Sequence, residues 1–294
     1  MSATPTVVDD EPGVFKRFLH GMTRSKSGFV GGLIVLFILA ITYLGPLIMG
    51  SDNAQDLRNP WQDPSGDHWL GTNKFGQDIF QQTMLGGVQP ISVGFLAGFI
   101  AVIVAIVLGA LAGYLRGWID TVVLYVTDVV VTIPALVLMI MLISVLDTLN
   151  SWQVALIIGL TAWPYLTRSI RAQVMSLKER EFVEAARLQD LGKGRIIFVE
   201  ILPNMVGFII ISFIIAVNNA IYALVGMYVL GLLPYTENNW GVMVNSGWED
   251  NAFYTTAGLL YIVVPLALII LFTIGLITLQ RSLEQIFNPR LRER

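Results

Sequence analysis

The chain contains no cysteine among its 294 residues and only two histidines, His20 and His68. The absence of cysteine excludes disulfides, thiolate chemistry and cysteine-ligated metal sites. Two histidines argue against a histidine-built metal site or a catalytic triad. The residues therefore give no nucleophile and base for an enzyme within the membrane, and no metal site or enzymatic activity is expected.

Charged residues are scarce as well. They make up 13% of the chain, whereas hydrophobic residues make up 55% and the mean hydropathy is +0.69. A soluble domain requires a more polar surface, so the composition predicts an integral membrane protein. The net charge of −3 lacks the basic excess that nucleic acid attracts, so no nucleic-acid partner is expected.

A nucleotide-binding loop is missing too. No stretch matches G-x-x-x-x-G-K-[ST], and the Gly192-Lys193-Gly194 run lacks the spacing that cradles phosphates. The chain is therefore not expected to bind ATP by this route, and energy from ATP would have to come from another subunit.

Six apolar segments are each long enough, at ~1.5 Å per residue, to cross ~30 Å of hydrocarbon as a helix. They are residues 29–49, 88–111, 121–146, 152–170, 205–230 and 257–279. The second segment holds the small-residue pairs Gly94/Gly98 and Gly109/Gly113, which allow helices to pack closely. The predicted fold class is an all-α integral membrane protein with six transmembrane helices.

Basic residues predict the orientation of these helices. With both termini in the cytoplasm, sixteen of the 18 Lys and Arg residues lie on inner segments, and only Arg58 and Lys74 lie outside. Such an excess is typical of cytoplasmic loops, so both termini are predicted to be cytoplasmic. Trp240 and Trp248, in a predicted outer loop, are expected to anchor at the membrane interface. The chain then divides into a cytoplasmic tail with an amphipathic segment (1–28), a first helix with an extracellular loop (29–87), a core of five helices (88–281) containing a cytoplasmic loop (171–204), and a cytoplasmic tail (282–294).

Residues 178–204 are rich in charge and lie between two apolar blocks, so they cannot enter hydrocarbon. Their first half contains good helix formers and predicts a short helix, on which Ala185 and Ala186 offer small side chains that another surface can approach. Glu184 can accept a charge-assisted hydrogen bond from that surface. The pattern indicates a contact site for another protein, although an ordinary solvated loop helix would show the same spacing.

The sequence EAARLQDLGKGRIIFVEILP at 184–203 resembles the EAA loop of ABC importer permeases, with the Glu-to-Pro spacing of that loop. In that family the loop forms a short coupling helix that sits in a groove of the ATPase subunit. The resemblance therefore implies the fold of a type I ABC importer permease. It also assigns ATPase coupling to Glu184, Ala185, Ala186, Arg187, Asp190, Gly192 and Pro203.

A second stretch, DHWLGTNKFGQD at 67–78, is similar to the H-x-L-G-T-D-x-x-G-R-D motif of dipeptide/oligopeptide-type permeases, of the second-permease "C" subunit kind. The stretch GYLRGWID at 113–120 fits the same group. Three positions depart from the pattern of that group: Asn73 replaces the usual Asp, Gln77 replaces the usual Arg, and Gln89 stands where Arg is common.

The turn of the coupling loop departs from the family as well. The family usually has Gly where this chain has Asp190, and Gly appears at position 192 instead. Asp tolerates the left-handed conformation better than most residues. Two outcomes therefore stay open: Asp190 keeps the turn, or the turn moves by two residues.

The resemblance also implies partners and a cargo. A single set of six helices is half of such a pathway, so we expect a homologous second permease, two ATPase subunits that bind ATP and Mg²⁺, and an extracellular solute-binding protein. The whole would lie in the lipid bilayer of a bacterial or archaeal plasma (inner) membrane, and this chain would carry no cofactor. Its transport step would be alternating access. The group mostly moves di- and oligopeptides, and oligosaccharides or nickel are the alternative cargoes.

Four polar residues within the predicted helices are candidates for a functional or structural role. Asp128 requires water or a partner at that depth, and structural pairing is favoured over a proton relay. Asn218, Asn219 and Tyr222 fall near the middle of one helix, where they either line a passage for solute or hydrogen-bond between helices. A relay at Asp128 would instead suit an ion-coupled secondary transporter, which needs no ATPase.

Overall fold

The computed structural model describes residues 26–50, 53, 55–146, 149–236 and 238–287. In this part of the chain the architecture is helical, and the only β pairing is an isolated bridge between Thr72 and Asp78. The amphipathic segment predicted within the N-terminal tail lies almost entirely outside the described residues, as does the end of the predicted C-terminal tail.

Six long helices, of 16 to 32 residues, form the body of the described chain. They are α2 (Lys26–Met49), α4 (Val88–Leu115), α5 (Gly117–Thr132), α7 (Ser151–Lys178), α11 (Val206–Val229) and α13 (Thr256–Phe287). Shorter elements connect them: α3 (Ile79–Leu85), α6 (Ala135–Ser144), α8 (Glu181–Leu188), α9 (Lys193–Arg195), the π-helix η1 (Ile196–Ile201), α10 (Leu202–Asn204), α12 (Trp240–Glu249) and the 3-10 helix η2 (Ala252–Tyr254).

Four helical runs of the described chain are long and apolar enough to cross a membrane: Lys26–Ile48, Ile79–Leu115, Val206–Val229 and Thr256–Phe287. Helices α5 and α6 together would make a fifth, although the chain bends by 86° between them. Helix α7 has 28 residues, as α4 does, but is too polar to meet the same criterion. Length and apolarity together therefore support four or five spans, and they do not confirm the sixth predicted span.

Helix α4 is the centre of the packing, and its glycines explain why. A Cβ at Gly98 would lie 2.9 Å from the backbone nitrogen of Val217 on α11, and a Cβ at Gly109 would lie 2.8 Å from the carbonyl oxygen of Thr167 on α7. The predicted small-residue pairs are confirmed as contact sites: the pair at 94 and 98 faces α11, and the pair at 109 and 113 faces α7.

The predicted third helix, 121–146, is not continuous. Ile133 and Pro134 separate α5 from α6, and the two helices meet at 86°. Proline has no N–H to donate to the preceding turn, and its ring disfavours the helical conformation of Ile133, which is extended at φ −88° and ψ 124°. The prediction of one helix here is wrong because it let the apolar pattern outweigh the proline.

Other helices differ from the prediction at their ends. Helix α4 continues to Leu115 beyond the predicted 111, α7 continues to Lys178 beyond about 170, and α13 continues to Phe287 beyond 279. Arg116, which adopts φ 56°, is the one residue between α4 and α5. The predicted cytoplasmic loop therefore begins as a continuation of α7, and the predicted C-terminal tail begins as a continuation of α13.

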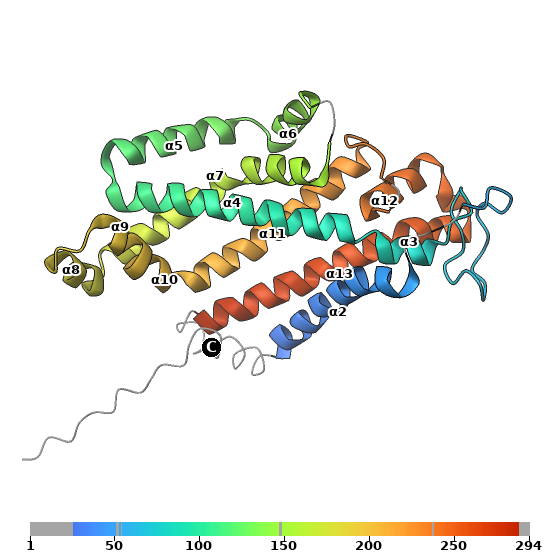
Figure 1. Ribbon diagram of the computed structural model, residues 1–294, viewed down its shortest axis with the longest axis horizontal. Helices are drawn as coiled ribbons and strands as arrows, with labels where there is room; N and C mark the ends of the chain where they lie inside the picture. Colours follow the sequence, from blue (N-terminus) through green and yellow to red (C-terminus); the bar gives the residue numbers. More distant parts are fainter. Residues whose placement is uncertain (1–25, 51–52, 54, 147–148, 237, 288–294) are drawn as a thin grey trace, which may run out of the picture.

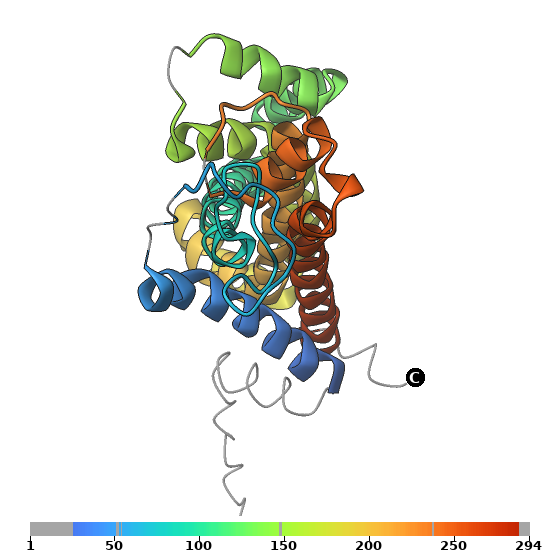
Figure 2. The same ribbon diagram turned by 90° about the vertical axis from the view of Figure 1, so that its right-hand side faces the viewer.

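Figure 1 shows α8 and α9 at one end of the molecule, and α12 with the loop 55–78 at the other. These are called the α8 end and the α12 end below. Helix α2 begins on the side that faces the α8 end, and α13 finishes on that side. An even number of membrane crossings by the chain would place its two described ends on one side of the membrane in this way. Figure 2 shows α2 along the lower edge of the bundle, where it meets α13, and the two helices contact each other.

Candidate functional site

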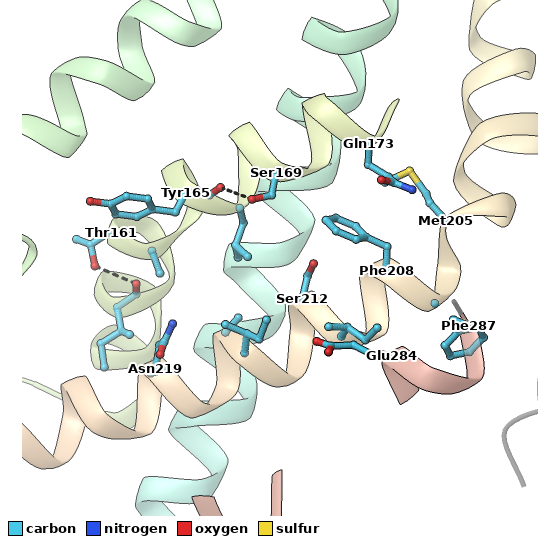
Figure 3. Close-up of a pocket in the computed structure, with 18 of the residues that line it drawn as sticks. Thr161, Tyr165, Ser169, Gln173, Met205, Phe208, Ser212, Asn219, Glu284 and Phe287 are labelled. Carbon is cyan, nitrogen blue, oxygen red and sulfur yellow. Dashed lines mark hydrogen bonds between the residues drawn. The ribbon is translucent and has the colours of Figure 1, made fainter. Parts of the chain in front are cut away.

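A cavity of about 1320 Å³ lies between α7 and α11. Residues of α6, α13 and the segment that follows α7 complete its wall, and Figure 3 shows α7 and α11 facing each other across it. Both helices pack on α4, so the cavity is the space left where α7 and α11 do not meet.

The α7 wall carries a row of uncharged polar side chains. Thr161, Tyr165, Ser169 and Gln173 recur at every fourth position and therefore lie on one face of the helix, which Figure 3 shows turned to the cavity. Thr161 Oγ1 donates to the carbonyl oxygen of Ile158 at 2.9 Å. This row helps make α7 more polar than the other long helices. The sequence analysis missed it, although the four-residue spacing of polar residues within one segment was the signal.

The α11 wall is mixed in character. Phe208, Ser212 and Asn219 line the cavity, at helical spacing. Of the three residues predicted near a passage on this helix, Asn219 is the one that lines the described cavity; Asn218 and Tyr222 do not. The side-chain oxygen of Asn218 is instead buried without a hydrogen-bond partner in the described part of the chain.

The charged side chains that line the cavity lie toward its α8 end. Among the described residues of the lining they are Arg180 and Glu284, and Arg180 is the residue before α8. Figure 3 shows Glu284 with Phe287 at one end of the cavity and Asn219 toward the other. The deeper wall offers hydroxyl, amide and apolar groups, so it can hydrogen-bond a solute without selecting for one sign of charge. Within the described residues, no group of three His, Asp or Glu side chains could hold a metal ion.

Two ion pairs join α5 to α7 beside this cavity. Arg171 binds Asp120 through two bonds, at 2.5 Å from Nε and 2.6 Å from Nη2. Two helical turns further along α5, the Asp128 carboxylate accepts a bond from the guanidinium of Arg168. Asp128 thus has a cationic partner on the neighbouring helix. These pairs matter for α5 because Thr127 is its only buried residue.

Helix α8 presents two different faces. Val183 and Ala186 are buried in a cluster with apolar residues of α4, α7 and η1, whereas Glu184, Ala185 and Leu188 are exposed. The sequence predicted that Ala185 and Ala186 both face a partner. Ala185 is exposed and can do so, whereas Ala186 packs inward and is only 5% exposed, so the prediction is wrong for Ala186. Leu188, which the sequence analysis did not single out, is 84% exposed.

The turn after α8 resolves the question of Asp190 and Gly192. Asp190 has φ 55° and its N–H donates to the carbonyl of Arg187 at 2.9 Å, while the N–H of Leu191 donates to the carbonyl of Ala186 at 3.2 Å. These two bonds and a left-handed residue define a Schellman helix end. Asp190 therefore occupies the position that glycine favours, whereas Gly192 has an ordinary φ of −58°.

Arg187 and Lys178 hold α8 against the ends of α4 and α7. Arg187 donates to the carbonyl of Lys178 at 3.2 Å, and its guanidinium lies 5.7 Å from the ring centre of Tyr114. Lys178 Nζ donates to the carbonyl of Tyr114 at 2.7 Å. Arg187, predicted as a coupling residue, is thus engaged within its own chain.

The segment that contains α8 begins and ends at the cavity. Arg180 precedes α8, and Asn204 and Met205 follow η1, and all three line the cavity. Between them, Pro203 is exposed in the first turn of α10. A displacement of α8 would therefore act on the cavity wall at two places, at the end of α7 and at the start of α11.

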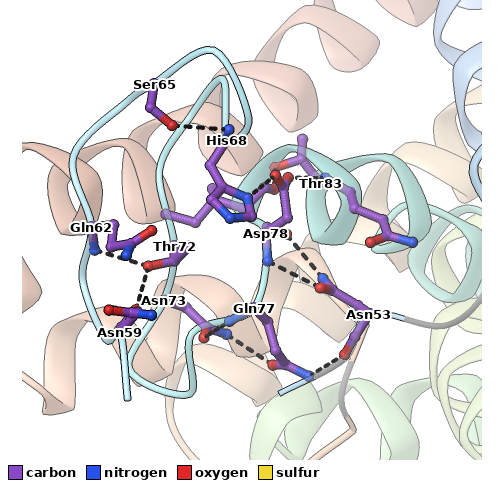
Figure 4. Close-up of polar contacts among 12 residues, drawn as sticks. Asn53, Asn59, Gln62, Ser65, His68, Thr72, Asn73, Gln77, Asp78 and Thr83 are labelled. Atoms are coloured by element: carbon purple, nitrogen blue, oxygen red, sulfur yellow. Dashed lines mark hydrogen bonds and ion pairs between the residues drawn. The ribbon is translucent and has the colours of Figure 1, made fainter. Parts of the chain in front are cut away.

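The motif at 67–78 forms a compact loop at the α12 end (Figure 4). His68 Nδ1 lies 2.8 Å from Asp78 Oδ2, and Asp78 also caps α3. Asn73 Nδ2 donates to the side-chain oxygens of Gln77 and Gln82, both at 3.0 Å, and all three amides are buried. Asn73 and Gln77, which replace the usual Asp and Arg, therefore bond to each other as a neutral pair.

Trp240 corrects another expectation at this end. Its side chain is 1% exposed, and its indole N–H donates to the carbonyl of Thr83 at 2.7 Å. The ring packs against Gly87, where a Cβ would come within 2.5 Å of it. Trp240 is a core residue and not an interface anchor, whereas Trp248 is 71% exposed.

Known proteins resemble this chain over most of its length. A family model described as "Binding-protein-dependent transport system inner membrane component" matches residues 105–293. The dipeptide transport system permease protein DppC of Alkalihalophilus pseudofirmus is 32% identical over 92% of this chain and 88% of that protein. The oligopeptide transport system permease protein OppC of Bacillus subtilis is 27% identical over 92% of this chain and 87% of that protein, and OppC of Mycobacterium bovis is 34% identical over 74% of each.

The matched residues include the cavity walls on α7 and α11 and the whole of α8. The relatives carry the names of dipeptide and oligopeptide permeases, so the resemblance predicted from the two sequence motifs is confirmed. The family comprises membrane components of transport systems, and the several apolar helices of this chain fit a multi-pass membrane protein. The chain therefore belongs to the family of binding-protein-dependent transport system inner membrane components.

Proposed function

We propose that the chain is a permease subunit of an ATP-driven ABC importer and forms half of its translocation pathway. Six spans are proposed, formed by α2, α3 with α4, α5 with α6, α7, α11 and α13, with both termini in the cytoplasm and the α8 end inside. Helix α7 serves as a span despite its polarity because its polar row faces the cavity instead of lipid. The membrane would be the plasma membrane of a bacterium or archaeon.

One observation carries this proposal: α8 stands at one end of the bundle with Glu184, Ala185 and Leu188 exposed, and its segment begins and ends at the cavity. A separate ATPase subunit would bind this exposed face, with Glu184 accepting a charge-assisted hydrogen bond. Closure of two ATPase subunits on ATP and Mg²⁺ would move α8 and so the ends of α7 and α11. A homologous second permease would supply the other half of the pathway, and the cavity would open to each side in turn.

Di- and oligopeptides are the proposed cargo, delivered by an extracellular solute-binding protein. The support is that relatives similar over most of the chain are named for dipeptide and oligopeptide transport. The neutral, hydrogen-bonding wall of Thr161, Ser169 and Asn219 suits a peptide backbone, whatever charges its side chains bear.

Charge reversal on the exposed face of α8 tests the proposal. The whole transporter is reconstituted in proteoliposomes with its binding protein, and uptake of a labelled peptide and peptide-stimulated ATP hydrolysis are measured. Glu184→Lys is expected to abolish both, because it removes the acceptor for the ATPase, without changing insertion of the chain. Glu179→Lys reverses the charge of another exposed acid, just before α8, and is the matched control. Full uptake by Glu184→Lys would sink the coupling role, and uptake of oligosaccharide in place of peptide would sink the cargo.

A further inference from the structure

Helices α7 and α11 meet at the α12 end and close the cavity there. Val154 and Ile158 of α7 are buried in one cluster with Leu224 and Met227 of α11. Toward the α8 end the cavity separates the same two helices (Figure 3). Within this chain, a route from the cavity to the α12 end between these two helices therefore requires α7 and α11 to separate.

Gln89, near the start of α4, joins both helices at this closed end. Its side-chain nitrogen donates to Ser151 Oγ of α7 at 3.1 Å, and its oxygen accepts from the hydroxyl of Tyr228 on α11 at 3.0 Å. The same oxygen accepts from Asn239 Nδ2, before α12, at 2.6 Å. These four residues, called the polar hub below, connect α4, α7, α11 and α12 through one side chain.

The three hydrogen-bond partners of Gln89, called the arms of the polar hub, differ in burial. Tyr228 is 4% exposed and Asn239 is fully buried. Asn239 also caps α12, since its side-chain oxygen accepts from the N–H of Gly241 at 2.7 Å. Ser151, by contrast, is the exposed first residue of α7. The bond to Ser151 is therefore the one that water can replace at the lowest cost.

We infer that Gln89 is a positioning residue for transport: its bond to Ser151 latches α7 to α11 and keeps the α12 end of the cavity shut. The inference rests on the proposed function, which assigns the α12 end to the outside and requires the cavity to open on either side in turn. Outward opening then breaks the bond to Ser151, while the buried arms keep α4, α11 and α12 together.

The chemistry of the amide makes this hub particular to the chain. A glutamine side chain accepts through its oxygen and donates through its nitrogen, so Gln89 receives two bonds and gives one. An arginine at this position could not receive the bonds from Tyr228 and Asn239, because a guanidinium has no acceptor.

The absence of cysteine permits a direct test, because Ser169→Cys places a single thiol on the cavity wall of this chain. The full transporter is expressed with cysteine-free partner subunits. Labelling of the thiol by a membrane-impermeant maleimide is timed from outside, in intact cells, and from inside, in inverted membrane vesicles. With Gln89→Leu added, labelling from outside is expected to accelerate about three- to tenfold, as the loss of the one hydrogen bond that opening breaks would give, and labelling from inside to slow or stay unchanged.

Two further variants separate the latch from a general loss of packing. Ser151→Ala removes only the exposed arm and should accelerate outside labelling about threefold. Gln89→Glu keeps a group that can accept from all three partners, so its labelling should stay within about twofold of the parent. Equal acceleration from both sides in Gln89→Leu would overturn the latch, as would unchanged outside labelling in Gln89→Leu and Ser151→Ala.

The labelling assay requires no peptide and no ATP, so its outcome is independent of the cargo. If labelling shifts as expected but the unaltered transporter takes up no peptide, the proposed cargo fails and the latch stands. If peptide uptake depends on Glu184 but labelling does not respond to Gln89→Leu, the latch fails and the proposed function stands.

Discussion

The two ends of the molecule hold their connecting segments by different means. At the α12 end many contacts are buried and uncharged, as in the amides of Asn73 and Gln77 (Figure 4), the amide of Gln82 and the indole of Trp240, and one ion pair joins Lys74 to Asp250. At the α8 end the described contacts involve cations, such as Arg187 on the carbonyl of Lys178, and the outer face of α8 is left exposed.

This difference in burial predicts a difference in energy. A buried polar network that loses one member leaves the others without partners and without water, so its disruption is costly. Contacts of exposed cations are replaced by water and contribute little. We therefore expect the exposed polar contacts at the α8 end to exchange with water more readily than the buried amides and indole at the α12 end, which suits a surface that transmits motion.

The largest effect is expected at Trp240. Trp240→Ala removes a fully buried ring and its bond to Thr83, and leaves a cavity beside Gly87. Such truncations of large core residues cost about 3–5 kcal/mol, so the midpoint of thermal unfolding in detergent should fall by roughly 10 °C.

Trp248→Ala is the matched control for this effect. The residue lies on the same helix, α12, but its side chain is 71% exposed. We expect its unfolding midpoint to stay close to that of the unaltered chain, because exposed substitutions change stability by about 0.5 kcal/mol or less. Similar losses for both tryptophans would contradict the assignment of Trp240 to the core.

An intermediate effect is expected at the ion pair between Asp120 and Arg171. The side chains are 16% and 21% exposed, so the pair is neither a surface pair nor a fully buried one. Arg171→Leu should destabilise the chain by about 2 kcal/mol, because it leaves the Asp120 carboxylate without its cation. The midpoint of unfolding in detergent would report this loss.

Removing both charges tests whether that loss comes from the unpaired carboxylate. The double variant with Asp120→Leu and Arg171→Leu should recover more than half of the stability that Arg171→Leu loses, since no unpaired charge remains. If the double variant is as unstable as Arg171→Leu, the pair holds α5 to α7 by shape and not by charge.

Local patterns in the sequence predicted much of this architecture. The apolar segments located the long helices, and the charge-rich run located the segment that contains α8. The glycine pairs of α4 identified its contact faces because close helix packing depends on the absence of a side chain at those positions. Such features are encoded within a few helical turns, so one sequence is enough to predict them.

Features that depend on distant parts of the chain were missed. Trp240 is buried by groups near Thr83, 157 residues away, and nothing in its own neighbourhood indicated this. The polar row that begins at Thr161 had a local signal, its four-residue spacing, but its meaning came from the cavity that α11 completes. The hub at Gln89 likewise draws on four separate helices, and only the fold brings them together.

The smallest effect is expected at the turn after α8. It comes from comparing a residue with positive φ at the α8 end with one at the α12 end. Asp190 and Gly76 both have positive φ, but a Cβ at Gly76 would lie 2.0 Å from the carbonyl oxygen of Asp56, whereas the turn at Asp190 accepts a side chain. Asp190→Gly should raise stability by up to about 1 kcal/mol, because glycine adopts this conformation without strain, and should leave peptide uptake unchanged. Gly192→Ala, with nothing within 4 Å of its added Cβ, should have almost no effect. A destabilising Asp190→Gly would mean that the Asp190 carboxylate contributes a contact of its own, and the turn at the α8 end would then depend on more than its backbone.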